Sequence, residues 1–146
     1  MSLAPLKNVY GGKAKVSNGY GGSPKSVLDK AVNKFSKDTH KYDKRTLVID
    51  GDVPITASFK ARCKRERYDL IIIHQICIEC FLLDLLHMSN NGATVCSGCK
   101  SILKSHMNYS NTADFEKKLP RFFPKTLLDV EKQSNKILDD LIKACM

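Results

Sequence analysis

Four cysteines arranged as two CxxC pairs are the residues of this sequence best suited to chemistry. Cys77 and Cys80 form the first pair, Cys96 and Cys99 form the second, and fifteen residues separate the pairs. Each pair can bring two thiolates to a common ion, and this separation is typical of four-cysteine zinc sites. Four thiolates close the coordination shell of zinc and leave no open position for a substrate. The spacing therefore predicts one structural Zn²⁺ held by all four cysteines.

Other residues could modify this site or act apart from it. His74, His87 and His106 lie nearby in the sequence, and any of them could replace a cysteine as ligand, although such histidines are more often surface or packing residues. Cys63, between two basic residues, could have a lowered thiol pKa and respond to oxidants, but an ordinary free thiol is the more common outcome. Cys145 could cross-link a dimer only under oxidising conditions.

The two pairs are expected on different kinds of element. The first falls inside an apolar stretch with helical periodicity, Tyr68–Met88, where a spacing of three residues would place Cys77 and Cys80 on one face. The second lies in Val95–Lys100, where Gly98 could adopt the left-handed conformation of a zinc knuckle. The sequence therefore predicts a site built from a helix-borne pair and a knuckle.

Two further elements are predicted before the cysteine pairs. Ser23 followed by Pro24 suits a helix start, and apolar residues then recur at helical spacing. Over residues 45–63, β-branched residues flank Asp50-Gly51-Asp52, a pattern typical of a β-hairpin with an Asp-Gly turn. Pro54 would place the second strand at an edge, because proline cannot donate to a ladder.

The ends of the chain differ in character. Residues 1–22 are rich in Gly and Lys and are expected to form a flexible basic arm, in which Tyr-Gly-Gly occurs twice. Residues 125–146 contain an amphipathic helix that either packs on the core or pairs with a second copy. Residues 23–124 would then form the zinc-stabilised core. The predicted fold class is α+β, mainly α, with the hairpin, the helix-borne pair, the knuckle and the C-terminal helix.

Positive charge is concentrated in the first half of the chain. Residues 1–69 carry 15 basic and 7 acidic side chains, whereas residues 70–146 carry 9 and 8. A charge asymmetry of this kind favours a polyanionic partner such as RNA or DNA. The densest cluster is expected to neutralise phosphates, or to serve as a nuclear import signal, and consists of Lys60, Arg62, Lys64, Arg65 and Arg67.

No pattern in the sequence indicates an enzyme. A phosphate-binding Gly-Lys loop and an HExxH motif are both missing, and a closed tetrathiolate would give Glu79 no activated water. The first residues lack the apolar stretch of a signal peptide, which favours an intracellular protein, cytoplasmic or also nuclear. Ionisable residues within Leu70–Leu86 argue against a membrane span and make a membrane partner unlikely.

The order of these features resembles the small cysteine-rich accessory proteins of plant RNA viruses. The resemblance rests on the basic residues Lys60 to Arg67 followed by the cysteines Cys77 to Cys99, about a quarter of the chain. It implies nucleic-acid binding, interference with host RNA silencing, and action as a homodimer. The long apolar helix around the first cysteine pair departs from that pattern.

Two hypotheses of different classes follow. In the first, a zinc-stabilised protein binds RNA or DNA, with RNA favoured, through its basic cluster and with weak sequence specificity. In the second, the zinc holds together an interaction module whose C-terminal helix recruits a twin or a host protein, and the basic half only aids solubility or import. An adaptor for anionic membranes is a third, less favoured possibility.

Overall fold

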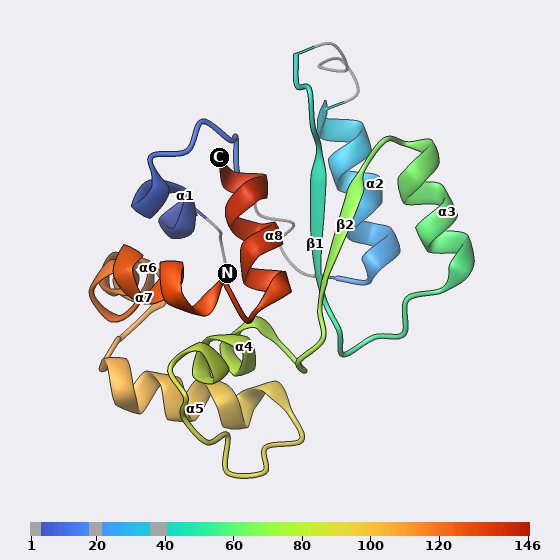
Figure 1. Cartoon of the computed structure of the whole chain (residues 1–146). Coiled ribbons are helices and arrows are strands. Elements are labelled where there is room, and N and C mark those ends of the chain that lie inside the picture. The colour runs from blue at the N-terminus through green and yellow to red at the C-terminus, as the bar shows by residue number, and fades with distance from the viewer. Residues whose placement is uncertain (1–3, 18–21, 36–40) are drawn as a thin grey trace.

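The chain folds around a parallel pair of strands packed between helices (Figure 1). The computed structural model describes residues 4–17, 22–35 and 41–146. The prediction of a mainly helical α+β protein is confirmed. In chain order the elements are α1 (Ala4–Tyr10), α2 (Pro24–Phe35), β1 (Thr46–Asp50), α3 (Ala57–Arg65), β2 (Asp69–Ile73), α4 (Ile78–Leu85), α5 (Cys96–Met107), α6 (Thr112–Phe122), α7 (Lys125–Glu131) and α8 (Lys136–Cys145).

The two strands separate two layers of helices. β1 and β2 pair in parallel, with Thr46 opposite Asp69 and Asp50 opposite Ile73. Because side chains alternate along a strand, Leu47 faces the opposite way from its neighbours. It joins a buried cluster with residues of α2 and α3, whereas Ile73 joins the main core on the α8 side. Each face of the small sheet is therefore covered by helices.

The prediction of a β-hairpin over residues 45–63 is wrong. β1 forms as expected, but the residues after the Asp-Gly turn become α3, and the partner strand of β1 is β2. Thr56 starts α3 by accepting a hydrogen bond from the backbone N–H of Phe59. Phe59 and Cys63 then lie four residues apart on the face that packs against the sheet. A β–α–β unit therefore replaces the hairpin.

The single helix predicted over Tyr68–Met88 is also wrong. Its first part is the strand β2, with the sequence DLIII, and only its second part, α4, is helical. Three consecutive isoleucines favour a strand buried on both faces, and a short apolar run of this kind looks alike in helices and in such strands. No helix among the described residues has the length and apolar character needed to cross a bilayer.

The helix starts show where local sequence rules hold. The backbone N–H of Ser26 donates to Ser23 Oγ, and Pro24 is the first residue of α2, as predicted. The C-terminal amphipathic segment, in contrast, is divided into α7 and α8, because Asn135 caps a new helix by accepting from the N–H of Leu138. Leu141, on the apolar face of α8, is 1% exposed. That face is therefore covered by the core of the same chain.

The segment predicted as a flexible arm contains a docked helix. α1 contacts α6 and α8, and Tyr10 Oη donates a hydrogen bond to Asp129 of α7 (3.0 Å). Gly12 passes so close to the carbonyl oxygen of Cys145 that a Cβ would lie 2.0 Å from it. The expectation of an arm is therefore wrong for residues 4–10. Residues 1–3 and 18–21, which include Tyr20 of the second Tyr-Gly-Gly, lie outside the described residues.

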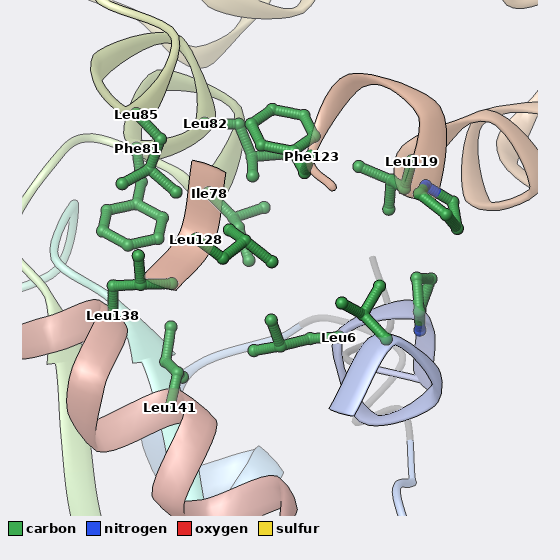
Figure 2. Close-up of a pocket in the computed structure, with 13 residues that line it drawn as sticks. Leu6, Ile78, Phe81, Leu82, Leu85, Leu119, Phe123, Leu128, Leu138 and Leu141 are labelled. Atoms are coloured by element: carbon green, nitrogen blue, oxygen red, sulfur yellow. The ribbon is translucent and has the colours of Figure 1, made fainter. Parts of the chain in front are cut away.

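Five helices close the main core around an apolar cavity (Figure 2). Leu6 of α1 points into it opposite Leu138 and Leu141 of α8, and α4, α6 and α7 supply the remaining walls. Because its lining is almost entirely apolar, the cavity has no polar groups to hold water. Docking of α1 therefore completes the core.

Replacing Tyr10 by Phe should weaken the docking of α1 in a pH-dependent way. Burial, followed by the hydrogen bond to the Asp129 carboxylate and its negative charge, raises the pKa of Tyr10 to about 12. Since this value exceeds the ordinary value of 10.0, the stabilisation is complete below pH 10 and is lost as pH rises towards about 12. Urea denaturation should find Tyr10→Phe less stable than the parent at neutral pH, with the difference shrinking above pH 10. A difference that is independent of pH would contradict this assignment.

Candidate cysteine centre and basic groove

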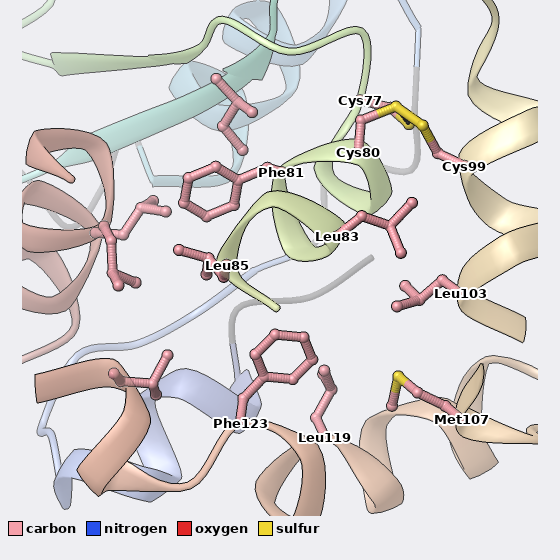
Figure 3. Close-up of a cluster of buried hydrophobic side chains, with 14 of the residues drawn as sticks. Cys77, Cys80, Phe81, Leu83, Leu85, Cys99, Leu103, Met107, Leu119 and Phe123 are labelled. Carbon is pink, nitrogen blue, oxygen red and sulfur yellow. Dashed lines mark hydrogen bonds between the residues drawn. A yellow bond between two sulfur atoms is a disulfide. The ribbon is translucent and has the colours of Figure 1, made fainter. Parts of the chain in front are cut away.

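The four predicted cysteines come together between two helix N-termini. Cys77 caps α4 and Cys80 lies in its first turn, while Cys96 and Cys99 occupy the first turn of α5. Cys77 is joined to Cys96 and Cys80 to Cys99 as disulfides, with Cα–Cα distances of 5.7 and 5.1 Å. Figure 3 shows the disulfide between Cys80 and Cys99, with Cys77 beside it. The prediction that both pairs meet in one cluster therefore matches this geometry, but zinc itself is not shown.

The second pair is borne on a helix and not on a knuckle. Gly98 lies in α5 and is absent from the residues with positive φ, so the left-handed conformation predicted for it is wrong. A Cβ at this position would lie 2.8 Å from Cβ of Ala93, so close packing accounts for the glycine. Leu83 of α4 and Leu103 of α5, both fully buried, pack below the cysteines (Figure 3). Two helices held by apolar contacts therefore present both cysteine pairs to each other.

A carboxylate lies beside the sulfur cluster. Cys96 Sγ is 3.4 Å from Glu79 Oε2, and the side chain of Glu79 is 13% exposed. Lys100 Nζ lies 3.9 Å from the other carboxylate oxygen and offsets its charge. Within the described residues, the atoms of Cys77, Glu79 and Cys96 lie close enough together to hold a metal ion. The sequence analysis gave Glu79 no binding role, because its approach to Cys96 depends on how α4 faces α5.

The three histidines considered as alternative ligands make other contacts or none near the sulfurs. His87 Nε2 lies 2.7 Å from Glu131 and its side chain is largely exposed. The ring of His106 packs edge-on against Phe122. His74 is exposed just after β2. None of them belongs to the group of metal-competent atoms found in the described part of the chain.

The positions of the sulfurs can be compared with those of a zinc tetrathiolate. At a Zn–S distance of about 2.3 Å, neighbouring sulfurs of a tetrahedron lie about 3.8 Å apart. The Sγ atoms of Cys77 and Cys80 lie 3.7 Å apart, which matches one edge of that tetrahedron. The Sγ atoms of Cys77 and Cys96, and those of Cys80 and Cys99, would have to move from bonding distance to about 3.8 Å apart. Thiolates are ligands that zinc accepts, and one separation in this cluster matches a tetrathiolate while the two disulfides do not.

Cys63 and Cys145 are both buried thiols. Cys63 is 2% exposed, and burial raises the pKa of its thiol more than the neighbouring Arg62 lowers it. The idea of a lowered Cys63 pKa is therefore wrong, and the thiol is not poised for reaction. Burial also raises the pKa of Cys145, which packs in the core and is not presented to a second copy.

Part of the predicted basic cluster lines a groove at the other end of the sheet. Lys60 and Lys64 of α3 and Arg67, just beyond α3, share it with Lys44 and Arg45, which directly precede β1. These five side chains define what we call the basic groove. Its other lining residues include two acids, Asp43 and Asp69, and two tyrosines, Tyr42 and Tyr68. The groove therefore carries a net positive charge.

The other two members of the predicted cluster do not line the groove. Arg62 is directed to α2, where its guanidinium forms an ion pair with Asp29 (2.5 Å). Arg65 is exposed at the end of α3 and is not part of the groove lining. The consecutive basic residues are divided in this way because neighbours on a helix point in different directions. The interaction of Arg62 is therefore structural, since it fastens α3 to α2.

Lys44 and Arg45 lie outside the basic cluster predicted from the sequence, Lys60 to Arg67. Parallel pairing places Thr46 opposite Asp69, so the residues before β1 lie beside those that connect α3 to β2. Lys44 lies 3.6 Å from Asp69 in an exposed pair, and such pairs contribute little to stability. The guanidinium of Arg45 lies 5.4 Å above the ring of Tyr68. A hairpin would pair β1 with the residues directly after the Asp-Gly turn. The predicted hairpin therefore gave no reason to expect Lys44 and Arg45 near residues 60–69.

Two groups in the groove are unusual. Arg67 has a φ of 59°, in the left-handed region where glycine is favoured at the end of a helix. The backbone there is held by hydrogen bonds from the N–H of Arg67 to Lys64 and from the N–H of Tyr68 to Cys63. Tyr68 is buried, and its hydroxyl has no hydrogen-bond partner among the described residues. His87, Asn91 and Asn108 share this backbone conformation among the described residues.

No protein-family model, curated protein or solved structure matches this chain.

Proposed function

We propose that this protein binds nucleic acid by seating phosphates in the basic groove. The observation that carries the proposal is the gathering of five basic side chains from two separate segments into one concavity: Lys44, Arg45, Lys60, Lys64 and Arg67. Neutralising phosphates releases the counterions condensed on the nucleic acid, which favours binding whatever the sequence. RNA as the preferred form, interference with RNA silencing and a homodimeric state stay predictions that rest on the resemblance.

The groove predicts a measurable dependence on salt. If three to five phosphates are bound, the affinity should fall between about 50 and about 200 mM salt, about 20- to 130-fold for a single strand and about 40- to 500-fold for B-form DNA. Fluorescence anisotropy with labelled RNA and DNA measures this directly. The double substitution Lys60→Glu/Lys64→Glu should abolish binding. The matched control Lys104→Glu/Lys117→Glu makes the same charge change at exposed positions of α5 and α6 and should retain it. Equal losses in the two variants would contradict a specific role for the groove.

Arg67→Gly should affect stability and binding in opposite directions. Glycine relieves the left-handed backbone and should raise the free energy of unfolding by up to about 1 kcal/mol in urea denaturation. Losing one phosphate contact should weaken binding and lower the salt slope by about 1. The control Arg65→Gly removes the same charge from a helical residue outside the groove. It should lower stability by about 0.5 to 1 kcal/mol and leave affinity nearly unchanged.

A structural Zn²⁺ at the cysteine centre is the second part of the proposal. Both disulfides connect the same two helices across the same sequence separation of 19 residues. Once one has formed, the second closes only a very small loop and adds little further restriction of the unfolded chain. A single ion, in contrast, needs all four sulfurs. Because the second disulfide adds little and a zinc ion uses all four sulfurs, and because Cys77 and Cys80 Sγ lie 3.7 Å apart, zinc is favoured in a reducing compartment.

Native mass spectrometry of protein purified under reducing conditions should find one zinc per chain. Cys80→Ser should lose the metal and unfold more readily, because the ion contributes to folding. Cys63→Ser, at a buried thiol outside the cluster, should keep it. A metal-free parent protein would contradict the zinc proposal, and a mass lower by four hydrogens would show in addition that both disulfides resist the reductant.

A further inference from the structure

We infer that the basic groove takes single-stranded nucleic acid and stacks a base on the aromatic pair Tyr42 and Phe35 at its edge. The inference rests on the proposed function and adds the class of ligand. Tyr42 lines the groove together with the five basic side chains, so a base and its phosphate could be held by adjoining groups. A positively charged groove with aromatic platforms is the general means by which proteins bind single strands.

The aromatic pair lies in a positively charged environment. The rings of Phe35 and Tyr42 meet edge to face, with centroids 6.2 Å apart and an interplanar angle of 87°. The ammonium groups of Lys15 and Lys34 each lie 5.7 Å from the centroid of Phe35. Both rings are only partly buried. In a perpendicular pair Phe35 can meet at most one face of Tyr42, so the opposite face does not contact Phe35, and the neighbouring lysines can meet the phosphates that flank a stacked base.

The positive track continues beyond the groove. Tyr42, Lys44 and Arg45 also line a second hollow that runs along β1 to Lys13 and Lys15. The second hollow also contains Asp50 and Asp52, and Tyr42 lies where it meets the basic groove. A strand that crosses this point would have phosphate contacts on both sides of the stacked base, whereas an isolated surface tyrosine would offer stacking alone.

A duplex fits this arrangement less well than a single strand does. In a duplex each base is stacked between its neighbours on both faces, so Tyr42 could reach one only after unstacking it. Reading base edges in a groove of DNA relies largely on Arg, Lys, Asn and Gln. No Asn or Gln occurs among the described residues that line the basic groove. Binding should therefore tolerate any sequence and prefer unpaired strands.

The test compares a short oligouridine with a hairpin duplex of equal charge, using the full chain. Tyr42→Leu should weaken binding of the single strand about 5- to 100-fold and leave duplex binding unchanged, because leucine keeps the apolar contact with Phe35 but cannot stack. Tyr42→Phe, the conservative control, should bind within about twofold of the parent. Thermal denaturation of each variant verifies that the fold is retained.

A spectroscopic readout separates stacking from charge. The chain has no Trp, so 2-aminopurine placed in the oligonucleotide can be excited without interference, and its fluorescence should be quenched by the parent and by Tyr42→Phe but not by Tyr42→Leu. Equal or tighter binding of the duplex, or an unchanged affinity of Tyr42→Leu for the single strand, would overturn the inference while the proposed function stands. A lack of salt-sensitive binding to either form would overturn both.

Discussion

The parallel pairing of β1 with β2 is the constraint on which the rest of the structure depends. Its register brings the residues before β1 beside those before β2, and the basic groove forms at these amino ends. Beyond the carboxyl end of β2 the chain turns directly into α4 and the cysteine centre. The two candidate sites therefore lie at opposite ends of one short sheet, with the groove end uppermost and α4 and α5 lowermost in Figure 1.

This separation assigns the two sites different tasks. The cysteine centre links α4 to α5, whose residues Leu83 and Leu103 also pack together. It therefore fixes the positions of the two helices that follow β2. None of its four cysteines is among the described residues that line the basic groove, so a metal bound there would support the fold without forming part of the groove. The groove depends instead on the smaller buried cluster beneath α2 and α3, which the Arg62–Asp29 ion pair closes at the surface.

Local signals in the sequence predicted local features well. Ser23 and Pro24 mark the start of α2, and the spacing of the four cysteines correctly predicted that they lie in one cluster. The partner of β1 could not be predicted, because an Asp-Gly turn and β-branched residues suit a hairpin as well as the start of a β–α–β unit. With the wrong partner for β1, the place of Lys44 and Arg45 in the basic groove could not be predicted either. The docking of α1 depends on Asp129, far along the chain, which no short window contains.

Cross-linking of a photoreactive oligonucleotide, followed by mass spectrometry, tests the central claim most directly. The lysines and arginines of the second half serve as an internal control, because most of them are exposed like those of the groove but lie in the region of α5 to α8. If phosphates bind in the basic groove, cross-links should concentrate in residues 42–45 and 60–68. Cross-links spread evenly over the surface, or concentrated on α5 to α8, would contradict the account.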